Sequence, residues 1–88
     1  MAIKVKLSPE FSEYAHNQEI VPVRGETIRE CLDNLIELYP AFKGLIFDSD
    51  SSLIALVIHR EKVIVRNKLD KPVTDHDEIL LRPMIYGG

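Results

Sequence analysis

Residues 27–40 have the sequence TIRECLDNLIELYP, which carries the clearest helix pattern in the chain. Thr27 and Glu30 have the spacing of a capping box, in which the threonine hydroxyl and the glutamate carboxylate each accept a hydrogen bond from an otherwise unpaired amide. Behind this cap, apolar side chains recur at helical spacing, at Ile28, Cys31, Leu32, Leu35, Ile36 and Tyr39. Because Pro40 cannot continue the hydrogen-bonded ladder, the pattern predicts one amphipathic helix that ends there.

Segments typical of β-strands precede and follow this helix. They are residues 2–7, 19–23, 53–59, 62–65 and 78–82, with short helical turns expected near 11–14 and 42–47. Pro22 cannot donate to a ladder, which places the second strand at a sheet edge. The order ββαβββ predicts an α+β domain, with one helix packed on a mixed sheet. We expect this domain to cover residues 1–82 and to be followed by a flexible, extended tail over 83–88.

The composition excludes several classes of protein. With 88 residues, the chain has room for one hydrophobic core. Its single cysteine excludes a disulfide framework and a cysteine-rich zinc site. The net charge of −3 disfavours nucleic-acid binding through bulk charge. The longest apolar run, 53–58, is too short to span a membrane, and no signal-peptide pattern opens the chain, so we expect a cytoplasmic protein with no membrane partner.

The side chains that could act as nucleophiles or metal ligands favour structural roles. Cys31 lies on the apolar stripe of the helix, where a small buried hydrophobic residue is expected. The histidines are scattered, and the acidic residues around His76 have the pattern of a turn, so we predict no metal site. Residues 60–71 hold five basic and two acidic side chains. This basic segment indicates either a solvated hairpin or a contact with an acidic partner or a phosphate.

The last two residues, Gly87 and Gly88, are unusual. Two adjacent glycines arise at a given place by chance in roughly one chain in two hundred. Without Cβ atoms, they allow a carboxyl group to thread a narrow channel and approach another molecule closely. Six extended residues reach about 20 Å, which is enough to deliver a carboxylate into a neighbouring active site. Four residues precede the glycines and would form a recognition arm, namely Pro83, Met84, Ile85 and Tyr86.

The whole chain resembles the ubiquitin-like β-grasp sulfur carriers. The resemblance rests on the capped helix at 27–39, on the segment Pro72-Val73-Thr74-Asp75-His76-Asp77-Glu78-Ile79 and on the ending Arg82-Pro83-Met84-Ile85-Tyr86-Gly87-Gly88. In the molybdopterin synthase small subunit, a glycine stands at the position of His76 and a second proline at the position of Met84. The resemblance implies a β-grasp fold and a carrier rather than an enzyme.

The resemblance also implies partners and a reaction. A separate ubiquitin-activating-like adenylyltransferase would adenylate the carboxyl group of Gly88 with ATP, and a sulfur donor would convert the adenylate to a thiocarboxylate. The carrier itself would bind no cofactor and no nucleic acid. Its acceptor would be an enzyme such as the molybdopterin synthase large subunit, in molybdenum cofactor biosynthesis. The alternatives are a carrier for cysteine, thiamine or tRNA thiolation, a protein modifier joined through Gly88 to lysines, and a plain interaction domain.

One surface of the predicted sheet is a candidate for partner binding. A sheet covered by one helix should alternate apolar and polar residues, yet 53–58 and 79–81 are apolar on both faces. Leu56 and Leu80 are out of phase with their apolar neighbours, so we expect them on the face away from the helix. Contiguous exposed patches of this kind usually mark binding sites. The alternative is that the loop at 41–52 folds over this face and covers it.

Overall fold

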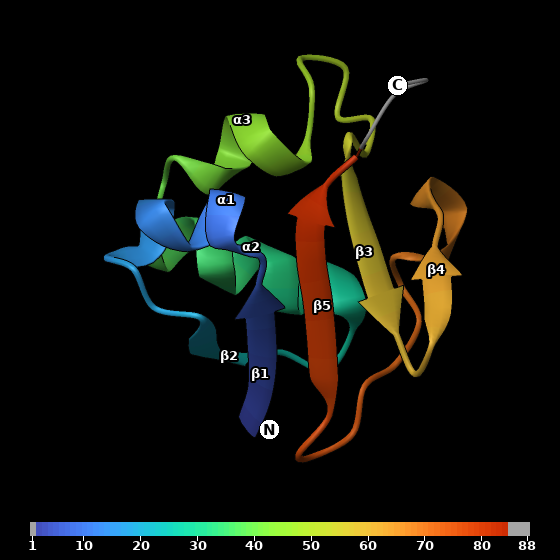
Figure 1. Ribbon diagram of the computed structural model, residues 1–88. Coiled ribbons are helices and arrows are strands. Elements are labelled where there is room, and N and C mark those ends of the chain that lie inside the picture. The colour runs from blue at the N-terminus through green and yellow to red at the C-terminus, as the bar shows by residue number, and fades with distance from the viewer. Residues whose placement is uncertain (1, 85–88) are drawn as a thin grey trace.

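The computed structural model describes residues 2–84. In chain order, the elements are β1 (Ala2–Leu7), α1 (Pro9–Ser12), η1 (Glu13–Ala15), β2 (Ile20–Arg24), α2 (Ile28–Leu38), α3 (Phe42–Ile46), β3 (Ala55–His59), β4 (Lys62–Ile64), η2 (Arg66–Lys68) and β5 (Glu78–Pro83) (Figure 1). The predicted order of strands and long helix is confirmed, with α1 and α3 at the two places where helical turns are expected.

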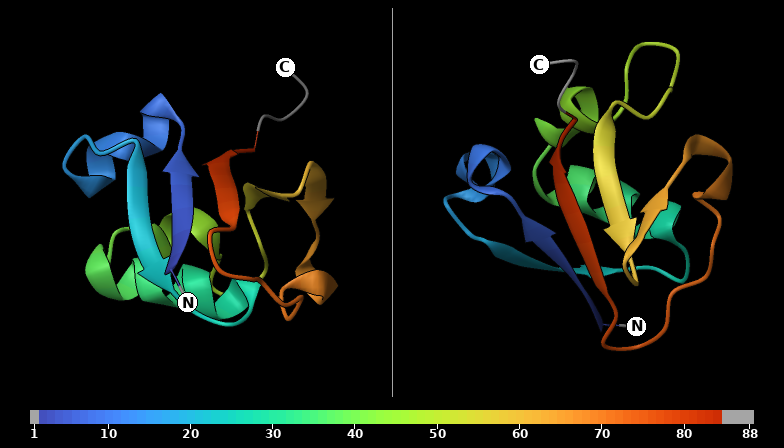
Figure 2. Two further views of the ribbon diagram at one scale, coloured as in Figure 1. Left: turned by 90° about the horizontal axis from the view of Figure 1, so that it is seen from below. Right: turned by 45° about the vertical axis from the view of Figure 1, so that its right-hand side comes forward.

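The sheet is mixed, and its strand order is β2-β1-β5-β3-β4. β5 lies in the centre, parallel to β1 and antiparallel to β3, while β2 and β4 form the two edges. The helix α2 crosses one face of the sheet, as the two further views show (Figure 2). This two-layer arrangement confirms the predicted α+β fold, and the edge position of β2 agrees with the proline it contains.

Some strand boundaries differ from those predicted. β3 begins at Ala55 rather than at residue 53, because Leu53 instead forms an isolated bridge with Phe47. At the other end of the sheet, β5 continues through Pro83, which pairs with Ala55. The residue that we expected to open the tail is therefore still part of the central strand.

The start of α2 is capped as the sequence indicates, with one difference. The Thr27 side chain accepts a hydrogen bond from the Glu30 amide at 3.1 Å. The Glu30 carboxylate accepts from the amide of Glu26 at 3.0 Å, one residue before the partner expected in a capping box. Gly25 lies so close to this first turn that a Cβ atom there would stand 2.7 Å from the Cys31 amide nitrogen. Glycine is thus required by close approach of the backbone.

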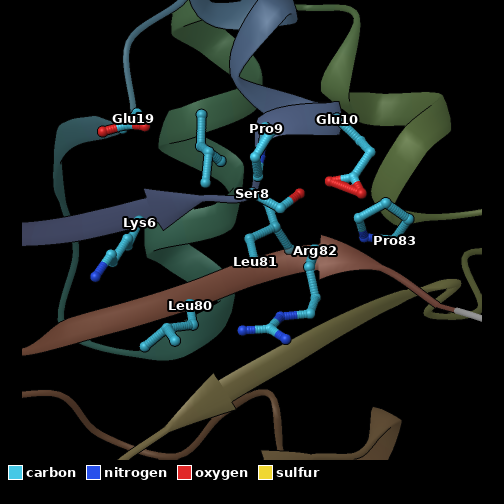
Figure 3. Close-up of a pocket in the computed structure, with 10 residues that line it drawn as sticks. Lys6, Ser8, Pro9, Glu10, Glu19, Leu80, Leu81, Arg82 and Pro83 are labelled. Atoms are coloured by element: carbon cyan, nitrogen blue, oxygen red, sulfur yellow. The ribbon is translucent and has the colours of Figure 1, made fainter.

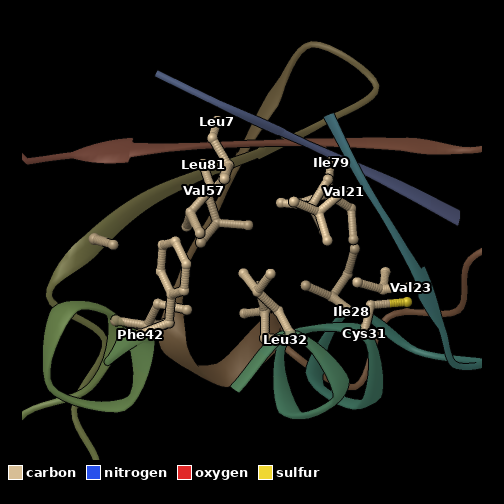
Figure 4. Packing of buried hydrophobic residues seen from close by; sticks show 14 of the residues in the cluster. Leu7, Val21, Val23, Ile28, Cys31, Leu32, Phe42, Val57, Ile79 and Leu81 are labelled. Carbon is tan, nitrogen blue, oxygen red and sulfur yellow. The ribbon is translucent and has the colours of Figure 1, made fainter. Parts of the chain in front are cut away.

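The hydrophobic core lies between the sheet and the helices (Figure 4). Ile28, Leu32 and Leu35 of α2 are fully buried against the inward-facing side chains of the strands. Phe42 of α3 is fully buried too, and its ring meets that of Phe11 edge to face at 5.9 Å. α3 therefore packs in the same layer as α2 and extends the core toward the end of the sheet where β5 finishes.

Cys31 occupies the position expected of a buried hydrophobic residue. Its side chain is 0% exposed and belongs to the core cluster. Burial, with a smaller contribution from the nearby Glu30 carboxylate, raises the pKa of the thiol to about 11. The thiol is thus neutral at physiological pH, which supports a structural role.

The turn before β5 is held by Asp77. Its carboxylate accepts hydrogen bonds from the Thr74 amide at 2.8 Å and from the Arg60 guanidinium at 3.1 Å, and lies 3.0 Å from Nε2 of His59. Desolvation alone would raise the pKa of this carboxyl, but the bonds from Thr74 and His59 and the charge of Arg60 lower it to about 2. The acidic turn is therefore a structural anchor that ties β5 to the end of β3.

Candidate functional site

The sheet face away from α2 carries a row of apolar side chains. Leu80 on β5 pairs with Ile58 on β3, and Ile58 pairs in turn with Val63 on β4. Leu56 lies on the same side of β3 as Ile58, two residues earlier. Leu56, Ile58 and Leu80 are half-buried, whereas Val57, Ile79 and Leu81 are buried on the opposite side of the same strands. We call Leu56, Ile58, Val63 and Leu80 the outer patch.

The expected orientation of Leu56 and Leu80 agrees with this burial pattern. Ile58 and Val63 belong to the same surface and were not identified from the sequence. The sequence does carry a signal for Ile58, because it lies two residues after Leu56 in the apolar run and therefore on the same face of the strand. Val63 could be placed only through its register with β3, which the sequence does not specify.

Charged side chains border the outer patch. Lys6 on β1 is the cross-strand partner of Leu80, and Arg82 on β5 is the partner of Leu56. Lys4 pairs with Glu78 one step further along β1. An apolar centre flanked by Lys6 and Arg82 suits a partner surface that is apolar in the middle and carries acidic groups opposite these two cations.

The loop at 41–52 leaves this face open. Within it, α3 and Phe47 contribute to the core on the helix side of the sheet, where the Arg29 guanidinium lies 5.2 Å from the centre of the Phe47 ring. The alternative that this loop covers Leu56 and Leu80 is therefore not supported. The outer patch is available to a partner.

A hollow lies beside the outer patch, where β1 and β5 end (Figure 3). Its volume is about 500 Å³, and it is bordered by Lys6, Ser8, Leu80, Arg82 and Pro83, among others. The Ser8 hydroxyl is buried and, among residues 2–84, has no hydrogen-bond partner. The hollow thus has an apolar wall and both cationic and acidic side chains, the latter from Glu10 and Glu19, next to the last residues of the central strand.

Only part of the predicted recognition arm falls within the described residues. Pro83 and Met84 are half-buried at the end of β5. Ile85, Tyr86, Gly87 and Gly88, which include the predicted covalent carrier, lie outside the described residues. The structure brings Pro83 to the end of the strand that carries Leu80, so the arm and the outer patch share one element.

No metal-binding or membrane-spanning feature is found in residues 2–84. No group of three or more histidine, cysteine, aspartate or glutamate side chains in this part of the chain could hold a metal ion. None of its helices has the length and apolar character needed to cross a membrane.

Comparison with known proteins identifies the fold. No protein-family model matches the chain, and no curated protein matches it by sequence. Small archaeal modifier protein 1 from Haloferax volcanii matches with a TM-score of 0.83 and 25% identity over 100% of both chains. A chain of the BexX/CysO complex from Amycolatopsis orientalis matches with a TM-score of 0.83 and 20% identity, over 99% of this chain and 100% of that one.

A third structure shares the same fold. A putative molybdopterin converting factor subunit 1 from Pyrococcus furiosus matches with a TM-score of 0.77 and 17% identity, over 97% of this chain and 99% of that one. These neighbours are ubiquitin-like β-grasp proteins, and the resemblance to β-grasp sulfur carriers inferred from the sequence is confirmed.

Proposed function

We propose that this chain, a ubiquitin-like β-grasp protein, is a sulfur carrier that holds sulfur as a thiocarboxylate at Gly88. The observation that carries the proposal is the placement of β5. This strand is paired on both sides in the centre of the sheet, and its sequence runs within five residues to Gly87-Gly88. A rigid central strand can present the start of such an arm, at Pro83, beside the outer patch.

The chemistry needs a partner enzyme, because a carboxylate is a poor electrophile. An adenylyltransferase would join the Gly88 carboxylate to AMP from ATP and release pyrophosphate. A sulfur nucleophile from a donor would then displace AMP and leave a thiocarboxylate. Gly87, lacking a Cβ atom, would let the arm enter a narrow active site. The Cys31 thiol, which is buried and neutral, would take no part in these reaction steps.

The outer patch would be the docking surface for the acceptor enzyme. Leu56 and Leu80 would supply apolar contacts, and Pro83 and Met84 would begin the arm that continues through Ile85 and Tyr86. Because Leu80 and Pro83 lie on one strand, docking on the patch would set the position of the arm. The patch supports this role, because its half-buried leucines and isoleucine adjoin the exposed Val63, and contiguous apolar surfaces of this kind usually mark protein interfaces.

Within this function, we place the chain first as the small subunit of a molybdopterin synthase in cytoplasmic molybdenum cofactor biosynthesis. The fold shared with a putative molybdopterin converting factor subunit supports this branch. A carrier for cysteine, thiamine or tRNA thiolation would use the same tail. A second function, conjugation through Gly88 to lysines of other proteins, is favoured by the 25% identity with a small archaeal modifier protein over the full chain.

The test is to follow the Gly88 carboxyl group directly. The protein is incubated with the adenylyltransferase of its own organism, ATP and sulfide, and the C-terminal peptide is examined by mass spectrometry. We expect one oxygen of the Gly88 carboxyl to be replaced by sulfur, equally in the wild type and in Cys31→Ala. A label found on Cys31, or an unmodified Gly88, would contradict the proposal.

A deletion variant tests the role of Gly88, and the product formed on Gly88 separates a carrier from a modifier. Deleting Gly88 should abolish sulfur transfer while leaving the melting temperature nearly unchanged, since a terminal residue contributes little to stability. Gly88 recovered in isopeptide linkage to lysines of other proteins, without a thiocarboxylate, would identify the chain as a modifier instead.

A further inference from the structure

The strand β4 presents a free edge on the side of the sheet far from β2 (Figure 1). It joins β3 through Arg60 and Glu61, whose φ angles of 53° and 66° fit the tight hairpin turn that requires two left-handed residues. Such a turn is closed by a hydrogen-bonded pair, here His59 and Lys62. The next pair, Ile58 and Val63, is then a non-hydrogen-bonded pair, so the Val63 amide and carbonyl point away from β3.

Among residues 2–84, none of the hydrogen bonds made by turns, loops and strand ends reaches these two Val63 groups. The side chains on this edge are apolar as well. Val63 is 59% exposed and Val65 is 53% exposed. An edge with unpaired backbone groups and exposed β-branched side chains is a template for pairing with another strand.

A basic groove runs along this edge. It lies between β4 and residues 68–72, and its lining includes Lys62, Lys68 and Lys71 but only one acidic residue, Asp70. The far wall is fixed, because the carbonyl groups of Leu69 and Lys71 accept hydrogen bonds from the first amides of α2. The groove is therefore formed in the protein without a partner.

We propose that β4 binds an extended acidic segment of a partner protein by adding it to the sheet as a further strand. The peptide backbone would bond to the Val63 amide and carbonyl. Side chains on a strand alternate between two faces, so every second peptide side chain would lie beside Val63 and Val65, and the others would face the lysines. The ligand is thus a segment in which apolar residues alternate with glutamate or aspartate.

The same features disfavour a nucleic acid as the ligand. Residues 60–71 contain no aromatic side chain on which a base could stack. The free amide and carbonyl of Val63 match a peptide backbone, which offers both a donor and an acceptor, whereas phosphate groups only accept. The proposal does not involve Gly88 and does not rest on the sulfur-carrier function, although its edge shares Val63 with the outer patch.

The test uses a fluorescein-labelled peptide in which valines alternate with glutamates, and it measures binding to the whole chain by fluorescence anisotropy. We expect binding that weakens as salt rises from about 50 to about 300 mM, because the lysines contribute through screened charges. Adding the peptide to the wild type should slow hydrogen exchange at the Val63 amide. A peptide with lysines in place of the glutamates should not bind.

Three variants locate the site. Lys62→Glu combined with Lys68→Glu should weaken binding by about tenfold or more, whereas Lys43→Glu on α3 should change it less than about twofold. Val63→Pro removes the outward amide at a position where an edge strand tolerates proline, and should weaken binding by about fivefold. A chain lacking Gly87 and Gly88 should bind as the wild type does.

Several results would overturn the proposal. These are the absence of peptide binding, equal binding by the lysine variants and the wild type, and unchanged exchange at the Val63 amide with peptide bound. Binding of a single-stranded oligonucleotide in preference to the peptide would also overturn it, since it would identify the groove as a polyanion site. If Val63→Pro fails to fold, the exchange measurement on the wild type still decides.

Discussion

Replacing Asp77 with alanine removes one carboxylate that serves three partners at the base of the central strand. The Thr74 amide loses an acceptor, Arg60 loses its ion pair and Nε2 of His59 loses its only hydrogen bond among residues 2–84. His59 is 0% exposed, and within the described part of the chain its Nδ1 atom has no hydrogen-bond partner. The variant therefore leaves a buried ring with no partner on either nitrogen.

The cost follows from these contacts. An unsatisfied buried polar group costs about 1–3 kcal/mol, and a lost turn hydrogen bond adds about 1 kcal/mol. The ion pair with Arg60 adds little, because the Arg60 side chain is 54% exposed. We expect Asp77→Ala to lower the free energy of unfolding at pH 7 by about 2–4 kcal/mol. For a domain of this size, the melting temperature should fall by roughly 10–25 °C.

The same carboxylate predicts a pH dependence. Its folded-state pKa of about 2 lies below the ordinary aspartate value of 3.8. A group of this kind stabilises the fold above its unfolded pKa and loses that contribution as the pH falls through the folded pKa. The stability advantage of the wild type over Asp77→Asn should therefore decline between about pH 4 and about pH 2, by an amount on the order of 1–2 kcal/mol after allowance for solvent screening.

Urea unfolding followed by circular dichroism, at several pH values, measures both effects. Asp70→Asn is the matched control, because Asp70 is exposed and the substitution removes the same charge. The reasoning fails if Asp77→Ala and Asp70→Asn are equally stable at pH 7. It also fails if the difference between the wild type and Asp77→Asn is the same at pH 2 as at pH 7.

Substitutions in the outer patch, at Cys31 and at Gly25 have further expected outcomes. Leu80→Asp or Leu56→Asp should weaken binding to the proposed acceptor enzyme, measured by calorimetry, by about 1 kcal/mol or more while the protein stays folded. Ile20→Asp on β2 is the control and should leave binding unchanged, whereas unfolding of both leucine variants would place these side chains in the core. Cys31→Ala should retain sulfur transfer but lower the free energy of unfolding, measured with urea, by on the order of 1 kcal/mol, because buried volume is lost. Loss of transfer at unchanged stability would contradict the structural role of Cys31. Gly25→Ala should lower the melting temperature, because its Cβ atom would stand 2.7 Å from a backbone nitrogen. Gly44→Ala in α3 is the control and should leave the melting temperature unchanged, because a Cβ atom there meets nothing within 4 Å.

The parts of the fold that could be predicted from the sequence are those set by local chemistry. The spacing of apolar residues and the Thr27 cap define α2, and Pro22 places β2 at an edge. The doubly apolar run in β3 correctly indicated that Leu56 faces away from the helix layer. Each of these signals lies within a few residues of sequence.

The features that could not be predicted depend on contacts between distant segments. His59 and Asp77 are 18 residues apart, and their contact exists only because β3 and β5 are neighbours. Val63 joins the outer patch through its register with Ile58, which only the hairpin geometry determines. The groove along β4 likewise requires residues 68–72 to be held against the start of α2. A single sequence specifies none of these pairings directly.

The position of β5 also has a consequence for the order in which the chain folds. In the sheet that residues 2–84 form, β1 and β3 are joined only through β5, which spans residues 78–83. The sheet therefore stays in two halves until that segment is available. Contacts this distant in sequence require a large loop to close before they contribute any stability, which slows folding. During synthesis we therefore expect the first hairpin and α2 to remain loosely organised until β5 leaves the ribosome. An activating enzyme that recognises the assembled sheet would then meet the arm only on molecules whose folding is complete.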